Sequence, residues 1–127
     1  MTDALKFYRK ENKVFKTEHS MFYSPQQATR IVRKLARHFN VEIRHITFSN
    51  RTQSSYAICY RREVLFPMEV DLLTICHEVA HIHNWEREIV AWSKTYKKHT
   101  KKLFDTIGKF IKYCQKRGYW VDELERI

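Results

Sequence analysis

Glycine and proline are scarce in this sequence of 127 residues, which contains two of each. A flexible glycine-rich linker and a stiff proline-rich spacer are therefore excluded. No internal repeat is visible. Apolar residues make up 43% of the chain, which is enough for one hydrophobic core. We therefore expect a single domain over residues 1–127, with its core at about 24–117.

Long hydrophobic runs are also missing. No apolar run approaches the ~20 residues that a membrane-spanning helix needs. Residues 1–13 are polar and lack the apolar segment of a signal peptide. These absences predict a protein that stays in the cytoplasm and has no membrane partner.

Cysteine is limited to Cys59, Cys76 and Cys114. An odd number without a C-x-x-C pair predicts neither a disulfide framework nor a zinc ribbon. Each cysteine lies among apolar residues, so we expect small buried hydrophobes.

The formal net charge of +10 is the strongest feature of the composition. A basic surface favours polyanions such as nucleic acid. The alternative is a basic protein whose lysines cover solvated faces, and charge alone does not separate the two.

An N-terminal helix is predicted over residues 25–39. Ser24 can cap it, Pro25 suits its first turn, and Gln27 stands where a capping-box partner belongs. Residues 1–23 show only weak periodicity and give no prediction.

The remaining patterns predict an α+β fold. A buried helix is expected over 69–83, with Asn84 as its C-cap, and an amphipathic C-terminal helix over about 99–116, ended by Gly118. Alternating and β-branched residues predict a small mixed three-stranded sheet over 41–49, 55–60 and 64–66.

The motif that carries chemistry is H-E-x-x-H at residues 77–81. Residues four apart share one helix face, so His77 and His81 can converge on one zinc ion. Glu78 follows one residue later and can act as general base on a water. Histidines and a carboxylate in a buried helix are costly unless something satisfies them. A metal would do so; the alternative is a pair of hydrogen-bonded core histidines.

A catalytic zinc site usually has three protein ligands and an open position. His99 is the preferred third ligand, because it falls in line with Leu103 on the inward face of the last helix. A continuous helix would place it too far from His81, so the chain must break between about 86 and 97, where Ser93 or Thr95 could cap a new helix. The alternatives are Glu86 and Glu88, just past the metal helix.

Other potential ligands are less suitable. His83 and Cys76 lie on the wrong side of the helix and are excluded. His19, His38 and His45 are distant in sequence, and geometry does not decide them.

Residues 41–113 resemble the SprT-like branch of the gluzincin-type zinc proteases. In that family a short sheet leads into the H-E-x-x-H helix, and a third histidine follows a variable loop. Thr100 stands here where the family usually has glycine. The matching segments are Ser54-Ser55-Tyr56-Ala57, Val64-Leu65-Phe66, Leu72 to His81, and His99-Thr100-Lys101-Lys102-Leu103-Phe104.

The resemblance implies a small zinc metallopeptidase domain that hydrolyses peptide bonds. Some family members cleave proteins crosslinked to DNA, and a basic chain is compatible with such substrates. The resemblance also implies that His99 is the third zinc ligand. The cysteine-rich ribbon of some members is absent.

Two further groups have a functional and a structural interpretation. Tyr56, Tyr60 and Tyr96 could stabilise an oxyanion, although such residues more often pack in strands or at core edges. A lysine stripe on the last helix could follow a phosphate backbone or form a solvated face. Its candidate nucleic-acid contacts are Lys101, Lys109 and Lys112.

The sequence therefore predicts a zinc-dependent metalloprotease acting on a protein or peptide substrate. A basic nucleic-acid-binding module with a structural zinc is one alternative. A catalytically inactive interaction protein that retains the protease fold is the other.

Overall fold

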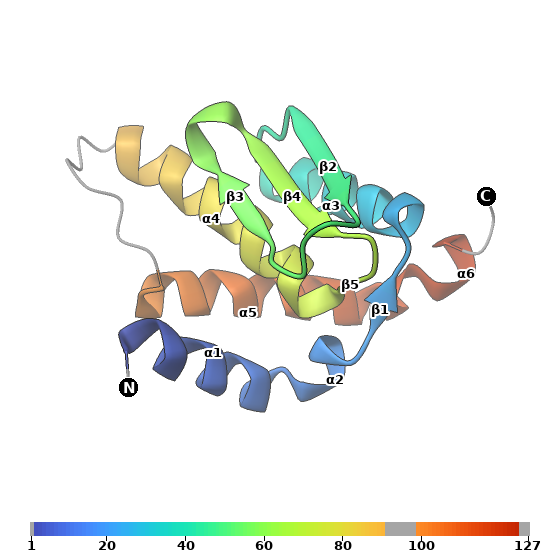
Figure 1. Cartoon of the computed structure of the whole chain (residues 1–127), viewed down its shortest axis with the longest axis horizontal. Helices are drawn as coiled ribbons and strands as arrows, with labels where there is room; N and C mark the ends of the chain where they lie inside the picture. Colours follow the sequence, from blue (N-terminus) through green and yellow to red (C-terminus); the bar gives the residue numbers. More distant parts are fainter. Residues whose placement is uncertain (1, 91–98, 125–127) are drawn as a thin grey trace.

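Helices dominate the chain, and the computed structural model describes residues 2–90 and 99–124. The fold is α+β, as the sequence predicts (Figure 1). The elements in chain order are α1 (Asp3–Val14), α2 (Lys16–His19), β1 (Phe22–Tyr23), α3 (Pro25–Phe39), β2 (His45–Ser49), β3 (Tyr56–Ile58), η1 (Cys59–Arg61), β4 (Glu63–Pro67), β5 (Val70–Asp71), α4 (Leu72–Val90), α5 (Lys101–Lys116), η2 (Gly118–Trp120) and α6 (Val121–Leu124).

The main sheet has three strands in the order β2-β4-β3. β2 runs parallel to β4 and β3 runs antiparallel to it, so the sheet is mixed, as predicted. The predicted strand over 41–49 begins only at His45, because Val41 and Ile43 turn into the core before the pairing starts. β3 is shorter than predicted, since the chain enters the 3-10 turn η1 at Cys59.

A second sheet, which the sequence did not predict, pairs β1 with β5. Phe22 lies opposite Asp71 and Tyr23 opposite Val70 in antiparallel register. Two-residue strands are too short to show alternation, so no sequence pattern announces them. This pairing fixes the start of α4 beside the N-terminal segment.

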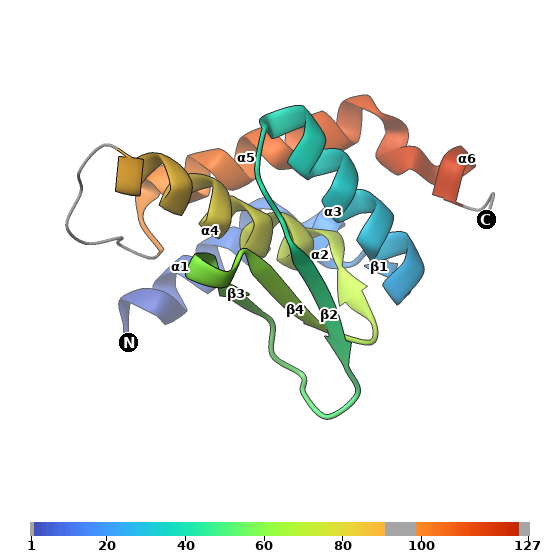
Figure 2. The same ribbon diagram turned by 90° about the horizontal axis from the view of Figure 1, so that it is seen from above.

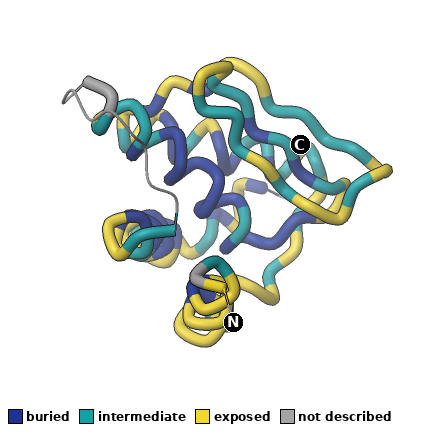
Figure 3. Tube along the Cα trace, turned by 60° about the vertical axis from the view of Figure 1, so that its left-hand side comes forward, coloured by how far each residue is buried: buried dark blue, intermediate teal, exposed yellow. Residues whose placement is uncertain are grey.

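Helix α4 forms the centre of the molecule. It lies between the main sheet and α5, and it also contacts α3 (Figures 1 and 2). Ile75, Val79 and Ile82 are fully buried along it. Figure 3 shows the buried residues in the middle of the molecule and exposed residues on the outer side of α1. The H-E-x-x-H segment is therefore part of a helix at the centre of the core.

Helix α4 is longer than the predicted 69–83. Asn84 does not end it, so the C-cap prediction is wrong. Asn84 is buried, and its Oδ1 accepts a hydrogen bond of 3.0 Å from the Thr106 hydroxyl on α5. The Asn84 side chain therefore links α4 to α5 and does not cap α4.

Helix α5 begins at Lys101, two residues later than predicted. Its N-cap is Thr100, whose hydroxyl accepts a hydrogen bond of 3.3 Å from the Leu103 amide. The predicted caps Ser93 and Thr95 lie outside the described residues. The helix ends at Lys116, and Gly118 follows with φ +58°, consistent with the predicted stop.

The N-terminal segment, for which the sequence gave no prediction, forms α1 and α2. The ring centroid of Phe15 lies 5.4 Å from that of Phe104, and Lys10 Nζ lies 4.4 Å above the Phe104 ring. Helix α1 therefore packs beside the first turn of α5 (Figure 1).

The three cysteines form no disulfide with one another, and Cys76 and Cys114 are fully buried as expected. Cys59 is only partly buried, because it lies in the surface turn η1. Within the described residues, no helix has both the length and the apolar character required to cross a membrane.

Candidate metal centre

Three histidines converge at one point: His77 and His81 from α4, and His99 from the segment before α5. One ring nitrogen of each lies within 4.8 Å of the others. His77 Nε2 and His81 Nε2 are 3.0 Å apart. Ligands of a tetrahedral zinc with bonds of ~2.1 Å are separated by ~3.4 Å, so this group, the histidine cluster, has suitable dimensions for a metal.

His99 reaches the cluster by a route that the sequence did not predict. It lies before α5, so the expected position on the inner face of that helix is wrong. Its φ is +53°, in the left-handed region, and Thr100 then starts the helix. This turn places the His99 ring centroid 5.3 Å from those of both His77 and His81.

The carboxylate of Glu11 orients His77. Glu11 is 3% exposed, and its Oε2 accepts a hydrogen bond of 2.5 Å from His77 Nδ1. A carboxylate accepts this bond, so Nδ1 carries a proton, and in the neutral ring the Nε2 lone pair faces the cluster. Metal-binding histidines are commonly held in this way.

Two opposing effects act on the pKa of His77. Burial lowers its pKa, while the hydrogen bond to Glu11 and the charges of Glu11 and Glu78 raise it. The acidic groups prevail, and the pKa of His77 is raised. The same negative charges attract a metal cation to this position.

Two aromatic residues of α1 border the cluster. The Tyr8 hydroxyl lies 3.1 Å from His99 Nε2, and the Tyr8 ring stacks on His77 with centroids 5.5 Å apart. The Phe7 ring meets His77 edge-on at 5.7 Å. Burial raises the pKa of Tyr8, and the charges of Glu78 and Glu11 raise it further. The phenol therefore keeps its proton at neutral pH.

A cavity of about 470 Å³ opens beside the cluster. Glu78, which is 6% exposed, lines it together with His77 and Tyr8. The rest of the wall comes from α1, α2, the start of α4 and the segment leading into β3, namely Glu11, Asn12, His19, Gln53, Ser54, Ser55, Tyr56, Leu73 and Thr74. A ligand in this cavity would contact the general-base candidate directly.

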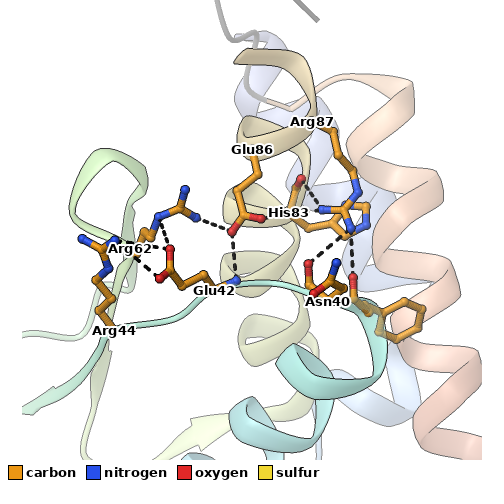
Figure 4. Close-up of polar contacts among 8 residues, drawn as sticks. Asn40, Glu42, Arg44, Arg62, His83, Glu86 and Arg87 are labelled. Atoms are coloured by element: carbon orange, nitrogen blue, oxygen red, sulfur yellow. Dashed lines mark hydrogen bonds and ion pairs between the residues drawn. The ribbon is translucent and has the colours of Figure 1, made fainter. Parts of the chain in front are cut away.

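The alternative third ligands are engaged elsewhere. Glu86 accepts a hydrogen bond of 2.9 Å from the Glu42 amide and pairs with Arg62, an arrangement that joins α4 to the segment before β2 (Figure 4). Glu88 pairs with Lys102 at 3.8 Å. In the described part of the chain, neither belongs to the histidine cluster.

The other four histidines also lie outside the cluster. His83 bonds to Asn84 at 2.7 Å, consistent with its exclusion, and burial lowers its pKa. His19 pairs with a carboxylate of β5 at 3.5 Å. His38 and His45 are exposed.

The three tyrosines considered as oxyanion donors differ in position. Tyr56 lines the cavity and is 54% exposed. Tyr60 is 76% exposed and lies outside the cavity lining, so the packing interpretation is wrong for it. Tyr96 lies outside the described residues.

Glu11 and Tyr8 are the site residues that the sequence analysis missed. Glu11 is 66 positions from His77, so no local spacing relates them. One signal was available: Glu11 is the only acidic residue in 4–14, a run with four basic residues.

Comparison of the chain with family models, curated proteins and solved structures finds no match. The histidine cluster and the adjacent cavity are therefore the features that indicate a function.

Proposed function

We propose that the chain is a zinc-dependent peptidase in which His77, His81 and His99 hold the metal and Glu78 is the general base. The observation that carries this proposal is the convergence of three histidine nitrogens within 4.8 Å, beside a cavity lined by Glu78. Imidazole nitrogens suit zinc, and three of them leave one coordination position open.

The chemistry divides between the metal and the side chains. When bound, zinc would act as a Lewis acid that polarises the scissile carbonyl. Glu78 takes a proton from the attacking water and delivers it to the leaving amine. Glu11 keeps the His77 ring in the tautomer that presents Nε2 to the cluster.

The position of β3 supports a peptide as substrate. β3 pairs with β4 on one side and forms an edge of the main sheet. Tyr56 at its start and the preceding residues 53–55 line the same cavity as Glu78. An extended peptide can add to such an edge as a further strand, which would bring its backbone to the general base.

The number of ligands favours a catalytic over a structural metal. A structural zinc site is closed by four protein ligands. The group found among residues 2–90 and 99–124 contains three histidines and no cysteine or carboxylate. The proposal also agrees with the resemblance to SprT-like proteases, for which His99 matches the third ligand.

Glu78 provides the test of this function. Zinc-loaded wild-type protein should hydrolyse casein, and a Glu78→Gln variant with equal zinc content should not. If fully loaded wild-type protein leaves casein and other unfolded proteins intact, the inactive interaction protein becomes the better interpretation.

Glu11→Gln should lower zinc affinity by about 10–100-fold, since it removes the charged partner of a metal-binding histidine. Competition against a chromophoric chelator measures the affinity. Glu18→Gln is the matched control, because Glu18 is equally buried at 3% and binds Tyr119 instead. Equal losses in both variants would contradict a specific role for Glu11.

We further propose that the substrates are proteins bound to nucleic acid. Lys101, Lys109 and Lys112 are exposed on α5, and Lys109 and Lys112 border a cavity of about 310 Å³ together with Phe104. Helix α1, which packs beside Phe104, adds further exposed basic residues: Lys6, Arg9, Lys10 and Lys13. Two adjacent helices therefore present basic side chains to solvent.

Changing Lys101, Lys109 and Lys112 together to Glu should weaken binding to duplex DNA and reduce its salt dependence, because each neutralised phosphate releases counterions. Fluorescence anisotropy from low to high salt measures both effects, and zinc content should stay unchanged. If the wild-type protein shows no binding, or binding that salt does not affect, these lysines form only a solvated face.

A further inference from the structure

The hydroxyl of Tyr8, a residue of the cavity lining, contacts the histidine cluster. It is 3.1 Å from His99 Nε2, and the Tyr8 side chain lines the cavity with His77 and Glu78. His99 itself does not line this cavity. Tyr8 therefore borders both the metal-binding group and the space where a substrate would lie.

The neighbours of Tyr8 hold its ring in place. The ring stacks on His77 with an interplanar angle of 19°, and it meets Phe7 edge-on at 6.2 Å. Helix α1 is capped by Thr2 and packs against α5 through Phe7, whose ring centroid lies 6.1 Å from that of Phe104. A phenol on a capped and packed helix has little reorganisation to undergo before it can donate a hydrogen bond.

Metal binding would remove His99 as a hydrogen-bond acceptor for the Tyr8 hydroxyl. The neutral imidazole of His99 has one nitrogen lone pair, and a metal ligand uses it. His99 Nε2 could then no longer accept a hydrogen bond from Tyr8, because it would either bind the metal itself or carry the ring proton while Nδ1 binds the metal. The Tyr8 hydroxyl would need another acceptor, and it borders the cavity that Glu78 also lines.

We propose that Tyr8 is a catalytic residue whose hydroxyl donates a hydrogen bond to the oxyanion formed during peptide hydrolysis. This inference rests on the proposed peptidase function. As the water oxygen bonds to the carbonyl carbon, the carbonyl π electron pair moves to its oxygen, and Glu78 takes the water proton. Tyr8 keeps its own proton throughout. The carbon–nitrogen bond then breaks, the electron pair returns to the carbonyl, and Glu78 protonates the amine.

Tyr8 differs in position from the tyrosines that the sequence suggested as oxyanion donors. Tyr60 does not line the cavity. Tyr56 lines it from the strand edge and has no hydrogen bond to the cluster among those of the described residues, whereas Tyr8 contacts a cluster nitrogen directly. A hydrogen-bond donor on α1 would also make that helix part of the active site.

Tyr8→Phe tests the proposal, because it removes only the hydroxyl and keeps the ring stacked on His77. We expect kcat on casein-derived peptides to fall by about 10²–10³-fold with KM changed less than twofold, as for loss of one oxyanion donor. Binding provides a second readout. Affinity for a phosphonamidate peptide, whose tetrahedral phosphorus carries an anionic oxygen, should fall by a similar factor, while zinc content and Tm stay constant.

Tyr60→Phe is the control and should match the wild type in all five measurements. Unchanged kcat and phosphonamidate affinity in Tyr8→Phe would reduce Tyr8 to a packing residue and overturn the proposal. A rise in kcat would overturn it as well, since the hydroxyl would then obstruct the metal. Failure of the loaded wild-type protein to cleave any peptide is a different result: it refutes the peptidase function and this inference with it.

Discussion

Glu78→Gln is expected to reduce kcat for casein hydrolysis by about 10²–10⁴-fold, the usual contribution of a general base. Glutamine has nearly the same shape as glutamate, so the buried site should keep its packing and its zinc. Only the capacity to accept the water proton is lost. Steady-state kinetics at equal zinc content, with Tm and circular dichroism as measures of folding, will show this effect.

The matched control is Glu88→Gln on the same helix. Glu88 pairs with Lys102 at 3.8 Å and does not line the cavity, so its loss should leave kcat within about twofold. If Glu78→Gln retains the wild-type rate, Glu78 is not the base, whatever metal the histidines bind.

His99→Ala should lower zinc affinity by more than the ~10–100-fold that loss of a supporting contact causes, because it removes a direct ligand. Hydrolysis should disappear at zinc concentrations that saturate the wild type. The expected cause is loss of metal, so the variant should remain folded, with an unchanged circular-dichroism spectrum. Competition with a chelator of known affinity gives the zinc constant.

The controls for His99 are Glu86→Ala and Glu88→Ala. Both should keep the wild-type zinc affinity. Glu86→Ala should also lower Tm, because Glu86 bonds the Glu42 amide and Arg62 (Figure 4). Zinc loss in Glu86→Ala together with normal zinc binding in His99→Ala would instead indicate a site of two histidines and one glutamate.

The parts of the fold that were predicted correctly depend on short-range patterns. The helix α3 and its capping box follow from residues three apart. The Ser24 hydroxyl accepts a hydrogen bond from the Gln27 backbone amide, and the Gln27 side-chain oxygen accepts one from the Ser24 backbone amide. The pairing of His77 and His81 follows from the same kind of spacing, since residues four apart share a helix face.

The parts that were missed depend on long-range contacts. Asn84 resembles a helix end in sequence, yet its bond to Thr106 on α5 lets α4 continue. Glu11 and Tyr8 come from a helix whose apolar residues show only weak periodicity, so the sequence pattern did not indicate either of them. Their partners in the cluster, His77 and His99, are 66 and 91 positions away.

His99 falls between these two cases. The sequence singled it out for its inward place on a helix, whereas the structure places it before that helix with φ +53°. Thr100, which departs from the glycine usual in the SprT-like pattern, is the N-cap that starts α5 immediately after it. The departure thus has a local structural role at the start of α5, directly after the turn that carries His99 toward α4.

The central claim is that the histidine cluster holds one zinc in a site with an open coordination position. Anomalous diffraction from zinc-loaded crystals, measured above and below the zinc absorption edge, tests it most directly. We predict one peak per chain at ~2.0–2.1 Å from a ring nitrogen of each of His77, His81 and His99, with no fourth protein ligand. Absence of a peak there, or a fourth side chain that closes the coordination shell, would contradict the account.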